Sequence, residues 1–407
     1  MAIMAILVLK FGGTSVGDLE RINHVADIIK AEANASHGIV AVVSAMSGVT
    51  NQLIDYCRQI SVLHDSREYD AVVSSGELVT AGLLSIALQD RGINARSWTG
   101  WQLPIETDGS HGKARIENIE TVELKNSLSK GEVPVIAGFQ GMGPDKRITT
   151  LGRGGTDTTA VAISAALRAE RCDIYTDVEG VYTSDPRIVS AARKLDRITY
   201  EEMLEMASLG ARVLQTRSVE LAMKHRVMIQ VRSSFSENAG TLVCDEEDIV
   251  EKETVSGIAY SNDEAKITLM GVDDRPGVAA SVFGALADSD INVDMIVQNV
   301  AEDGSTDITF TVARADLDLA TDVIGNKSEI GCREMTSDSS VVKVSVIGVG
   351  MRSHAGVAQT MFRALADKGI NIQVISTSEI KVSVLISEEY TELALRSLHT
   401  AYGLDAE

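Results

Sequence analysis

The sequence is short of basic residues and of prolines. Lysine and arginine number 37 against 58 aspartates and glutamates, which gives a formal net charge of −21. Proteins that bind nucleic acid or an anionic membrane surface present a positive footprint, so this balance argues against both partners. An anionic substrate would have to be received by a local group of cations. With only 5 prolines and 44% hydrophobic residues among 407, we expect two or three packed domains and no long disordered tract.

Cysteine is also scarce, and none of the four stands in a CxxC or Cys/His spacing typical of zinc or thioredoxin-like sites. Reduced, buried thiols are therefore predicted at Cys57, Cys172, Cys244 and Cys332. No run approaches the ~18 apolar residues of a membrane span. The apolar start, residues 1–9, is short and lacks a charged segment, so it predicts a first strand rather than a signal peptide. We expect a cytoplasmic protein.

Strand and helix patterns alternate over residues 1–245, which is typical of an α/β layer fold. Buried strands are predicted at 3–9, 39–43, 133–137 and 172–176. Helices are predicted from Asp18, from Thr50, over 78–88 and over 156–169. The acidic segment 245–253 has no apolar pattern, and we place a domain boundary there.

The remainder of the chain contains a repeat. Residues 276–296 match residues 355–375 at a constant offset of 79, with 11 of 21 positions identical. Each copy follows an apolar strand pattern and precedes two more strands and a helix, which is the βαββαβ order of a ferredoxin-like module. The second copy lacks its last strand. We predict that the spare strand pattern at 255–260 completes it, so that the first module is inserted into the second.

Small glycine-containing loops follow or precede the expected elements, at 10–15, 42–48, 151–159 and 175–187. Backbone N–H groups in such loops, together with a helix N-terminus, favour an anion. Lys10 comes before its glycines, so this is not a Walker A loop, and the protein-kinase motif set is missing. A lone Gly-Gly turn is more often structural. A position at the carboxyl end of a strand, where α/β folds bind ligands, favours a functional loop.

Six segments, in this order, resemble the aspartokinase family. They are KFGGTSVG at 10–17, VVSAMSGVTN at 42–51, SSGELVTA at 74–81, GFQG at 138–141, LGRGGTDTTA at 151–160 and YTDVEGVYTSDPR at 175–187. The repeat resembles the paired ACT domains of that family. The resemblance covers nearly the whole chain. It implies an α/β fold in which an amino-acid-kinase α/β/α sandwich precedes two ferredoxin-like ACT modules, with one enzymatic activity and no fused homoserine dehydrogenase.

The implied domains are a catalytic domain at 1–245, a linker plus the completing strand at 246–263, a first ACT module at 264–337 and a second at 338–407. The implied reaction transfers the γ-phosphoryl group of ATP, with Mg²⁺, to the β-carboxylate of L-aspartate. The product is 4-phospho-L-aspartate, the entry to lysine, threonine, methionine and diaminopimelate synthesis. A carboxylate with a pKa near ~3.9 is already a nucleophile at neutral pH, so no His or Cys base is required. Catalysis would rest on alignment and charge neutralisation.

The resemblance implies three catalytic residues. Lys10 resembles the lysine that bridges the transferred phosphoryl group, Asp157 the aspartate that orients it, and Arg153 the clamp on a substrate carboxylate. Ser44 and Thr50 resemble substrate-pocket hydroxyl groups.

Glu77 resembles the partner of the substrate ammonium. The implied ATP-binding residues are Lys10, Phe11, Gly12, Gly13, Thr176, Asp177, Tyr182, Arg187 and Arg212. Many relatives carry lysine where Arg212 stands, which leaves the geometry of its phosphate contact open. No metal ligand is assigned, because Mg²⁺ would be held mainly by ATP oxygens.

The ACT modules are expected to bind amino-acid effectors, lysine and threonine singly or together, and to form a homo-oligomer. An assembly with an ACT-only subunit made from an internal start is also open. The candidate effector-binding residues are Asp274, Ala279, Asn292, Val293, Asp294 and Gln298 in the first module and Gly356, Val357, Asn371, Gln373 and Thr377 in the second. The alternative role of the modules is a dimerisation scaffold alone.

Two other functions are alternatives to an aspartokinase. An amino-acid kinase acting on glutamate or acetylglutamate is disfavoured by the 74–81 motif and the ACT pair. A non-catalytic amino-acid sensor predicts damage at Lys10, Arg153 or Asp157, and all three are intact.

Overall fold

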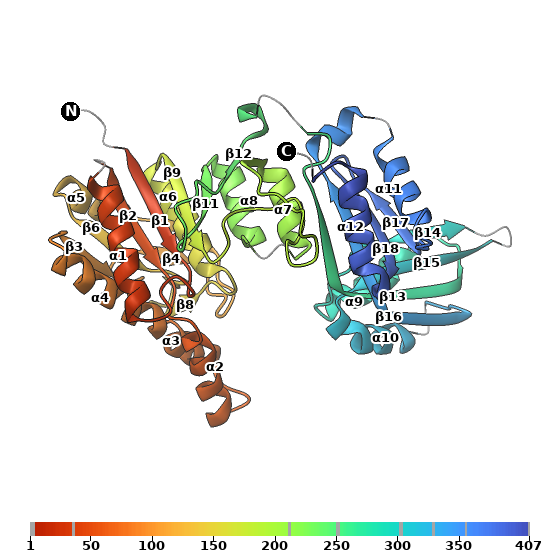
Figure 1. The fold of residues 1–407 in the computed structure, drawn as a ribbon. Coiled ribbons are helices and arrows are strands. Elements are labelled where there is room, and N and C mark those ends of the chain that lie inside the picture. The colour runs from red at the N-terminus through yellow and green to blue at the C-terminus, as the bar shows by residue number, and fades with distance from the viewer. Residues whose placement is uncertain are drawn as a thin grey trace. The chain divides into compact units, whose positions relative to one another are not determined.

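A computed structural model describes residues 5–34, 37–210, 213–249, 253–300, 304–327, 330–354 and 356–405 (Figure 1). The chain forms two compact units. The first unit comprises Met1–Val181, Lys194–Ala207 and Arg212–Val250. The second unit comprises Tyr182–Arg193, Ser208–Ala211 and Glu251–Glu407.

The first unit is built on an eight-stranded sheet with the order β10-β12-β11-β9-β1-β2-β6-β3. Its strands are β1 (Ile6–Phe11), β2 (Gly38–Val43), β3 (Ala95–Trp98), β6 (Val133–Ala137), β9 (Arg171–Thr176), β10 (Arg197–Thr199), β11 (Ile229–Ser233) and β12 (Thr241–Cys244). All neighbours pair in parallel except β11 and β12. The four strands predicted from the sequence are β1, β2, β6 and β9, the central part of this sheet.

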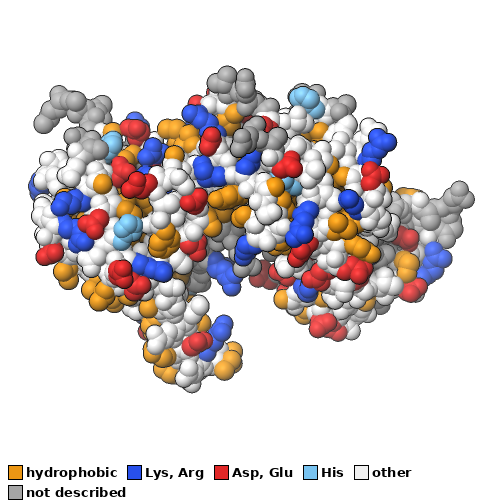
Figure 2. Space-filling view, viewed as in Figure 1, with side chains coloured by type: hydrophobic (Ala, Val, Ile, Leu, Met, Phe, Trp, Pro, Cys, Tyr) orange, Lys and Arg blue, Asp and Glu red, His pale blue; other side chains and the backbone are white. Residues whose placement is uncertain are grey.

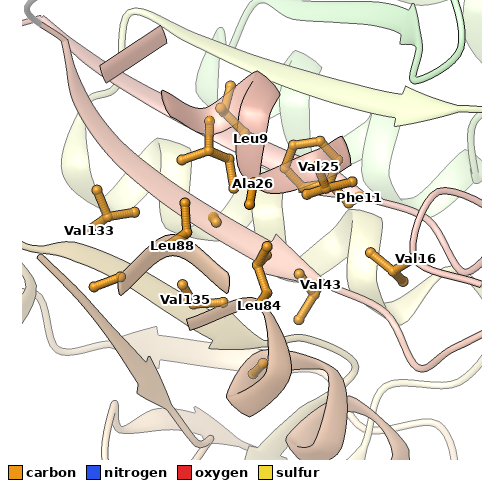
Figure 3. Packing of buried hydrophobic residues seen from close by; sticks show 14 of the residues in the cluster. Leu9, Phe11, Val16, Val25, Ala26, Val43, Leu84, Leu88, Val133 and Val135 are labelled. Atoms are coloured by element: carbon orange, nitrogen blue, oxygen red, sulfur yellow. The ribbon is translucent and has the colours of Figure 1, made fainter. Parts of the chain in front are cut away.

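Helices cover both faces of this sheet. The helices of the first unit are α1 (Leu19–Asn34), α2 (Val49–Ile60), α3 (Ser66–Val73), α4 (Ser75–Asp90), α5 (Val122–Ser129), α6 (Gly155–Leu167), α7 (Tyr200–Ser208) and α8 (Thr216–His225). Leu9 and Phe11 of β1 pack with α1 and α4 in one buried cluster (Figure 3). Because successive strand residues point to opposite faces, Val8 and Lys10 face the other side, where α6 contacts β1.

A smaller four-stranded sheet, ordered β5-β4-β7-β8, lies in the first unit and was not predicted. Its strands are β4 (Ile105–Thr107), β5 (Ile116–Ile119), β7 (Gln140–Met142) and β8 (Ile148–Thr150). These strands have three or four residues each, too short for a period of two to stand out in the sequence. The hairpin tip predicted at 143–146 joins β7 to β8, and the Gly143 N–H donates to the Arg147 carbonyl.

The surface of the first unit includes an apolar end at α2. No residue of α2 is buried, and Ile60, Val62 and Leu63 are more than four-fifths exposed. Figure 2 shows hydrophobic side chains reaching the surface in this region. The run Ser66–Asp90, which joins α3 and α4, is long and apolar enough to cross a membrane by length and composition alone. Half of its most apolar window is buried inside the fold.

The second unit contains one six-stranded antiparallel sheet shared by both repeat copies, with the order β14-β15-β13-β16-β18-β17. Its strands are β13 (Gly257–Asp273), β14 (Val297–Val300), β15 (Ser305–Val312), β16 (Glu334–Ile347), β17 (Val374–Thr377) and β18 (Lys381–Ser387). Its helices are α9 (Val278–Asp288), α10 (Leu317–Gly325), α11 (Val357–Ala366) and α12 (Thr391–Ala401).

Strands β13 and β16 each serve both modules. Residues 257–261 of β13 pair with 343–347 of β16 in the second module, whereas 264–270 pair with 334–341 in the first. The strand expected at 255–260 thus lies in the sheet of the second module. It is not a separate element, however, because it runs on without a break into the strand expected at 267–272.

The segment 182–193 differs from its predicted place, because the structure groups it with the second unit rather than with the rest of 1–245. Val189 is buried in the core of the second ACT module. Thr183 accepts an N–H from Ile258 at its carbonyl, and its hydroxyl lies 2.9 Å from Nε2 of the buried His399. Apolar burial and these bonds draw the segment to α12, which no local sequence pattern reveals.

All four cysteines are free, but only Cys172 and Cys244 are buried, whereas Cys57 and Cys332 are partly exposed. The prediction of buried thiols is therefore correct for two and wrong for the other two. Burial raises the pKa of the Cys172 thiol to about 12, so it stays protonated at neutral pH.

Candidate active site

The centre of the eight-stranded sheet is the point where the chain order reverses. β1 lies between β2 and β9 in parallel, so the loops that leave these strands meet at one edge. The Gly12 N–H donates to the Tyr175 carbonyl, and the Ser44 N–H donates to the Phe11 carbonyl. The loops at 10–15, 42–48 and 175–187, predicted separately from the sequence, therefore begin side by side.

Lys10 and Asp157 form an ion pair at this edge. Lys10 is the last but one residue of β1, and Asp157 lies in the first turn of α6. The Lys10 Nζ atom lies 2.6 Å from Oδ1 of Asp157, and both side chains are about 10% exposed. A pair this deeply buried is shielded little by water, so the ammonium group is held in one place. Both residues stand in the quoted motifs, but their pairing could not be predicted from the sequence.

Phe11 and Gly12 do not fit the roles that the resemblance implied. The Phe11 side chain is fully buried on the opposite face from Lys10 and stacks on Tyr175 with 4.8 Å between ring centroids. The Gly12 N–H is taken by the Tyr175 carbonyl. The Gly13 N–H has no acceptor among the described residues, so Gly13 is the glycine of this loop with a donor available for an anion.

The N-terminus of α6 offers further donors beside the ion pair. The N–H groups of Thr156 and Asp157 lie in the first helical turn and have no acceptor in the described part of the chain. Arg153 stands just before the helix, is exposed, and pairs with no described carboxylate. Two uncommitted amides, a helix dipole and a free guanidinium make this end of α6 suited to anions.

Gly154, the N-cap of α6, has no room for a side chain. Its φ is +67°, and a Cβ atom there would lie 1.8 Å from Cγ of Gln215. We expect Gly154→Ala to lower the free energy of unfolding by about 1 kcal/mol for the left-handed backbone and by a further ~1–3 kcal/mol for the clash. Urea unfolding of the full chain measures both.

Gly131→Ala is the matched control for this prediction. Gly131 has nearly the same φ, +69°, but no atom lies within 4 Å of its ideal Cβ. It should show the backbone cost alone. Equal destabilisation in the two variants would mean that Gln215 moves aside without cost.

Glu77 is the most perturbed carboxylate of the site. It lies in the first turn of α4, is 3% exposed, and accepts the Ala45 N–H at Oε1 with a distance of 3.1 Å. Its other oxygen, Oε2, is buried without a partner. Burial raises the pKa of Glu77 to about 7. An unsatisfied buried carboxylate oxygen is costly unless a donor, such as a ligand ammonium, completes it.

Ser44 and Thr50 stand on either side of Ala45, the residue whose N–H donates to Glu77. Both are half-buried, Ser44 directly after β2 and Thr50 in the first turn of α2, whose N-cap Gly48 has a φ of +83°. Neither hydroxyl group bonds to another described residue, so both remain available to a ligand.

The residues assigned to the nucleotide fall into three groups. Thr176 and Asp177 follow β9 in the first unit, with the Thr176 hydroxyl 3.1 Å from Oδ1 of Asp177. Tyr182 and Arg187 belong to the segment grouped with the second unit, where the exposed Arg187 pairs with Asp185 at 2.7 Å. Arg212 lies outside the described residues.

Asp70 is a structural carboxylate that sequence reasoning missed. It is fully buried and accepts hydrogen bonds from His111 Nδ1 at 2.7 Å, from the Gly112 N–H, and from both the N–H and the hydroxyl of Thr150. These bonds fix the chain three residues before Arg153. Only the three-dimensional fold brings α3 to these loops, so no spacing in the sequence could have shown it.

The repeat copies are alike in their first turns. Gly277 and Gly356, 79 residues apart, are the N-caps of α9 and α11 with φ of +96° and +100°. Among the candidate effector residues Val357 is buried and Ala279 and Val293 are half-buried. The exposed ones are Asp274, Asn292, Asp294, Gln298, Gly356, Asn371, Gln373 and Thr377.

Two of these exposed residues already tie the modules together. The Asp294 carboxylate of the first module bonds to Lys343 of the second, which also pairs with Glu264 at 2.5 Å. At the equivalent position of the second module, Gln373 Oε1 accepts from Lys266 of the first at 2.5 Å. Asp294 is a candidate effector-binding residue, and the structure pairs its carboxylate with a lysine of the same chain.

The chain matches known protein families along most of its length. Residues 5–233 match the amino acid kinase family, and residues 266–326 and 344–402 each match the ACT domain. Over 405 residues the chain is 56% identical to the aspartate kinase of Pseudomonas putida, covering 99% of this chain and 98% of the relative. The chain belongs to the aspartate kinases of the amino acid kinase family. The predicted family, fold class and kinase activity are confirmed.

Other aspartate kinases agree with this membership. The aspartokinase of Mycolicibacterium smegmatis is 48% identical over 407 residues, which cover 98% of this chain and 97% of the relative. Among solved structures, Escherichia coli aspartokinase III in complex with aspartate and ADP has a TM-score of 0.81 at 29% identity, covering 97% of this chain and 99% of that one. The same enzyme in complex with lysine and aspartate has a TM-score of 0.78 at 29% identity, covering 98% and 99%.

Proposed function

We propose that this aspartate kinase transfers the γ-phosphoryl group of ATP to the β-carboxylate of L-aspartate and forms 4-phospho-L-aspartate. The observation that carries the proposal is the buried Lys10–Asp157 pair at the N-terminus of α6, at the edge where β1 and β2 end. The solved relative that holds aspartate and ADP supports the same pair of substrates.

The aspartate substrate would be held at both ends. Its ammonium group would complete the unsatisfied Oε2 of Glu77, and its α-carboxylate would pair with the free guanidinium of Arg153. The β-carboxylate is then left as the nucleophile, already ionised at neutral pH. No general base is needed, so the work of the site is alignment and charge neutralisation.

The phosphates of ATP would meet the donors near Lys10. Its ammonium would bridge the transferred phosphoryl group, while Asp157 keeps the ammonium in position. The N–H groups of Gly13 and Thr156 would donate hydrogen bonds to the phosphate oxygens as negative charge develops on them. The described residues hold no group of three or more His, Cys, Asp or Glu side chains suited to a metal. We propose that Mg²⁺ is held mainly by ATP oxygens, where it would supply charge neutralisation.

This reaction would be the first step of lysine, threonine, methionine and diaminopimelate biosynthesis, carried out in the cytoplasm. The test is ADP release with MgATP and L-aspartate, with hydroxylamine trapping of the acyl phosphate and glutamate as the control. Aspartate-dependent hydroxamate supports the proposal. A preference for glutamate would assign another amino-acid kinase, and amino-acid binding without turnover would assign a sensor.

We also propose feedback inhibition by lysine, threonine or both at the ACT modules. The repeat supports this proposal, because left-handed Gly277 and Gly356 are the N-caps of α9 and α11, and the exposed Asn292 and Asn371 occupy the same position in the two copies. Lysine is bound in a solved relative. A coupling of about 1–3 kcal/mol per effector would change aspartate affinity about 5–150-fold.

The matched pair Asn292→Ala and Asn371→Ala tests this regulation. Loss of inhibition in one variant identifies the module that binds the effector, and the other serves as its control. Unchanged kinetics of the unmodified protein across millimolar lysine plus threonine would contradict the proposal and leave the modules as a scaffold.

We also propose that the protein forms a homo-oligomer through its ACT modules. The edge strands β14 and β17 leave backbone groups unpaired, and Val300 and Ile375 on them are exposed. Light scattering after size exclusion measures the assembly. An antibody against the carboxyl-terminal half shows whether cells also make a short ACT-only subunit.

A further inference from the structure

A cationic pocket of about 330 Å³ lies in the first unit, apart from the Lys10–Asp157 pair. It is lined by Asp108, Ser110, Lys113, Arg115 and Arg217. Three cations and one carboxylate leave a formal charge of +2 in a chain whose net charge is −21. Such a local reversal of charge is the feature an anion site requires.

The one carboxylate in the pocket offsets only part of the charge of the three cations. Oδ1 of Asp108 accepts the N–H of Ser110 at 3.2 Å and of Arg115 at 3.0 Å, and these bonds, the Arg115 one first, lower the pKa of Asp108. The head groups of Lys113 and Arg115 form no ion pair with any described carboxylate. The carboxylate is thus committed to backbone donors.

The third cation is fixed in place before any ligand arrives. Arg217 donates from Nη1 to the Leu151 carbonyl at 2.9 Å and from Nη2 to the Ala114 carbonyl at 2.8 Å. Burial, and then the neighbouring charge of Arg115, lower the pKa of Arg217. A guanidinium held between carbonyls beside a second cation is pre-organised to receive an anion.

The pocket walls also hold the loop that carries Arg153. Arg217 binds the carbonyl of Leu151, and the Ala114 N–H donates to the Thr150 carbonyl at 2.9 Å. A Cβ atom on Gly152 would lie 3.2 Å from the Gly112 carbonyl oxygen. Arg153 follows directly, so anything that orders the 112–115 turn also orders its loop.

We propose that this pocket binds a small multivalent oxyanion, of the phosphate or dicarboxylate kind, through Lys113, Arg115 and Arg217. Its occupancy braces the Arg153 loop and lowers the KM for aspartate. The second statement rests on the function proposed above, whereas the binding itself does not.

Calorimetric titration of the full chain with inorganic phosphate, at constant ionic strength set with KCl, tests the binding. We expect saturable binding that weakens at least tenfold in Arg115→Gln. It should be unchanged in Lys125→Gln, which removes an exposed lysine of α5, and should persist in Arg153→Gln. Parallel titrations with sulfate and with succinate distinguish a site for tetrahedral anions from a site for dicarboxylates. Absence of saturable binding of all three anions, or equal affinity in Arg115→Gln with an unchanged Tm, would overturn the site.

The dependence of aspartate KM on phosphate tests the bracing. Saturating phosphate should lower the KM at least twofold in the unmodified protein and leave Arg115→Gln unaffected. The KM could instead stay unchanged although the protein binds phosphate and phosphorylates aspartate. That result would contradict the effect on the Arg153 loop but not the anion site. Phosphate binding without aspartate-dependent turnover would contradict the proposed function but not the anion site.

Discussion

Lys10→Met is expected to lower kcat by about 10³-fold, because it removes the buried charge that we propose bridges the transferred phosphoryl group. The ammonium is 2.6 Å from Asp157 and nearly buried, so no water or second cation can readily replace it. The loss should be in kcat more than in the KM for aspartate, since our proposal has Glu77 and Arg153 hold the ammonium and α-carboxylate of the substrate. Steady-state kinetics with coupled ADP detection measure both constants.

Asp157, the partner of Lys10, allows a second test of the ion pair. In Lys10→Met the Asp157 carboxylate stays buried without a counter-charge, which should cost about 3 kcal/mol of stability and repel the phosphates. The double variant Lys10→Met/Asp157→Asn removes that charge. It should recover most of the lost stability and about tenfold in kcat, because the two effects act on one interaction. Additive losses in the double variant would mean that the residues act separately.

Controls separate chemistry from folding. Lys125→Met removes an exposed lysine of α5 in the same unit and should leave kcat and Tm unchanged. Lys10→Arg keeps the charge in a larger, planar group, and should recover only part of the activity because its donors cannot occupy the same point. Full activity in Lys10→Met would show that the phosphoryl group lies away from β1.

The central strands of the fold could be predicted because they are continuous apolar runs bounded by turn residues, as in Gly38–Val43. Their order could not, because parallel pairing joins β1 to β9 across more than 150 residues. The shared strand of the second unit was predictable in part. A repeat that lacked one strand pointed to residues 255–260, but nothing local showed that β13 continues through both modules.

The candidate site divides in the same way. The resemblance of the sequence motifs to the aspartokinase family indicated Lys10, Arg153 and Asp157. The motifs did not reveal that the Phe11 side chain is buried on the face of the sheet opposite Lys10. Asp70 gave no signal at all, since its partners come from loops distant in the chain.

The pH dependence of aspartate use is expected to follow Glu77. In the free protein burial raises the pKa of this carboxyl to about 7, so below that pH it carries a proton and cannot pair with the substrate ammonium. We expect kcat/KM for aspartate to fall about tenfold per pH unit below about 7, because this ratio reports groups of the free enzyme. The fall in kcat should begin at lower pH, since bound ammonium stabilises the carboxylate.

Glu77 should also make the free protein less stable as the pH rises. The folded chain keeps the proton up to about pH 7, whereas the unfolded chain loses it near the ordinary glutamate pKa of 4.5. Unfolding therefore releases a proton between these values, and the free energy of unfolding falls as pH rises through this window, by up to about 3 kcal/mol. Above pH 7 the folded protein carries a buried charge with one oxygen unpaired.

Glu77→Gln separates the two effects in one variant. The amide cannot neutralise an ammonium, so the KM for aspartate should rise about 100-fold and its acid-side pH dependence should vanish. At pH 8 the same variant should unfold at a higher urea concentration than the unmodified protein, because the buried charge is gone. Glu123→Gln, an exposed position of α5, should change neither quantity. A variant that lost stability at pH 8 while keeping its KM would place the substrate ammonium elsewhere, and Glu77 would then be a structural acid that the fold itself neutralises.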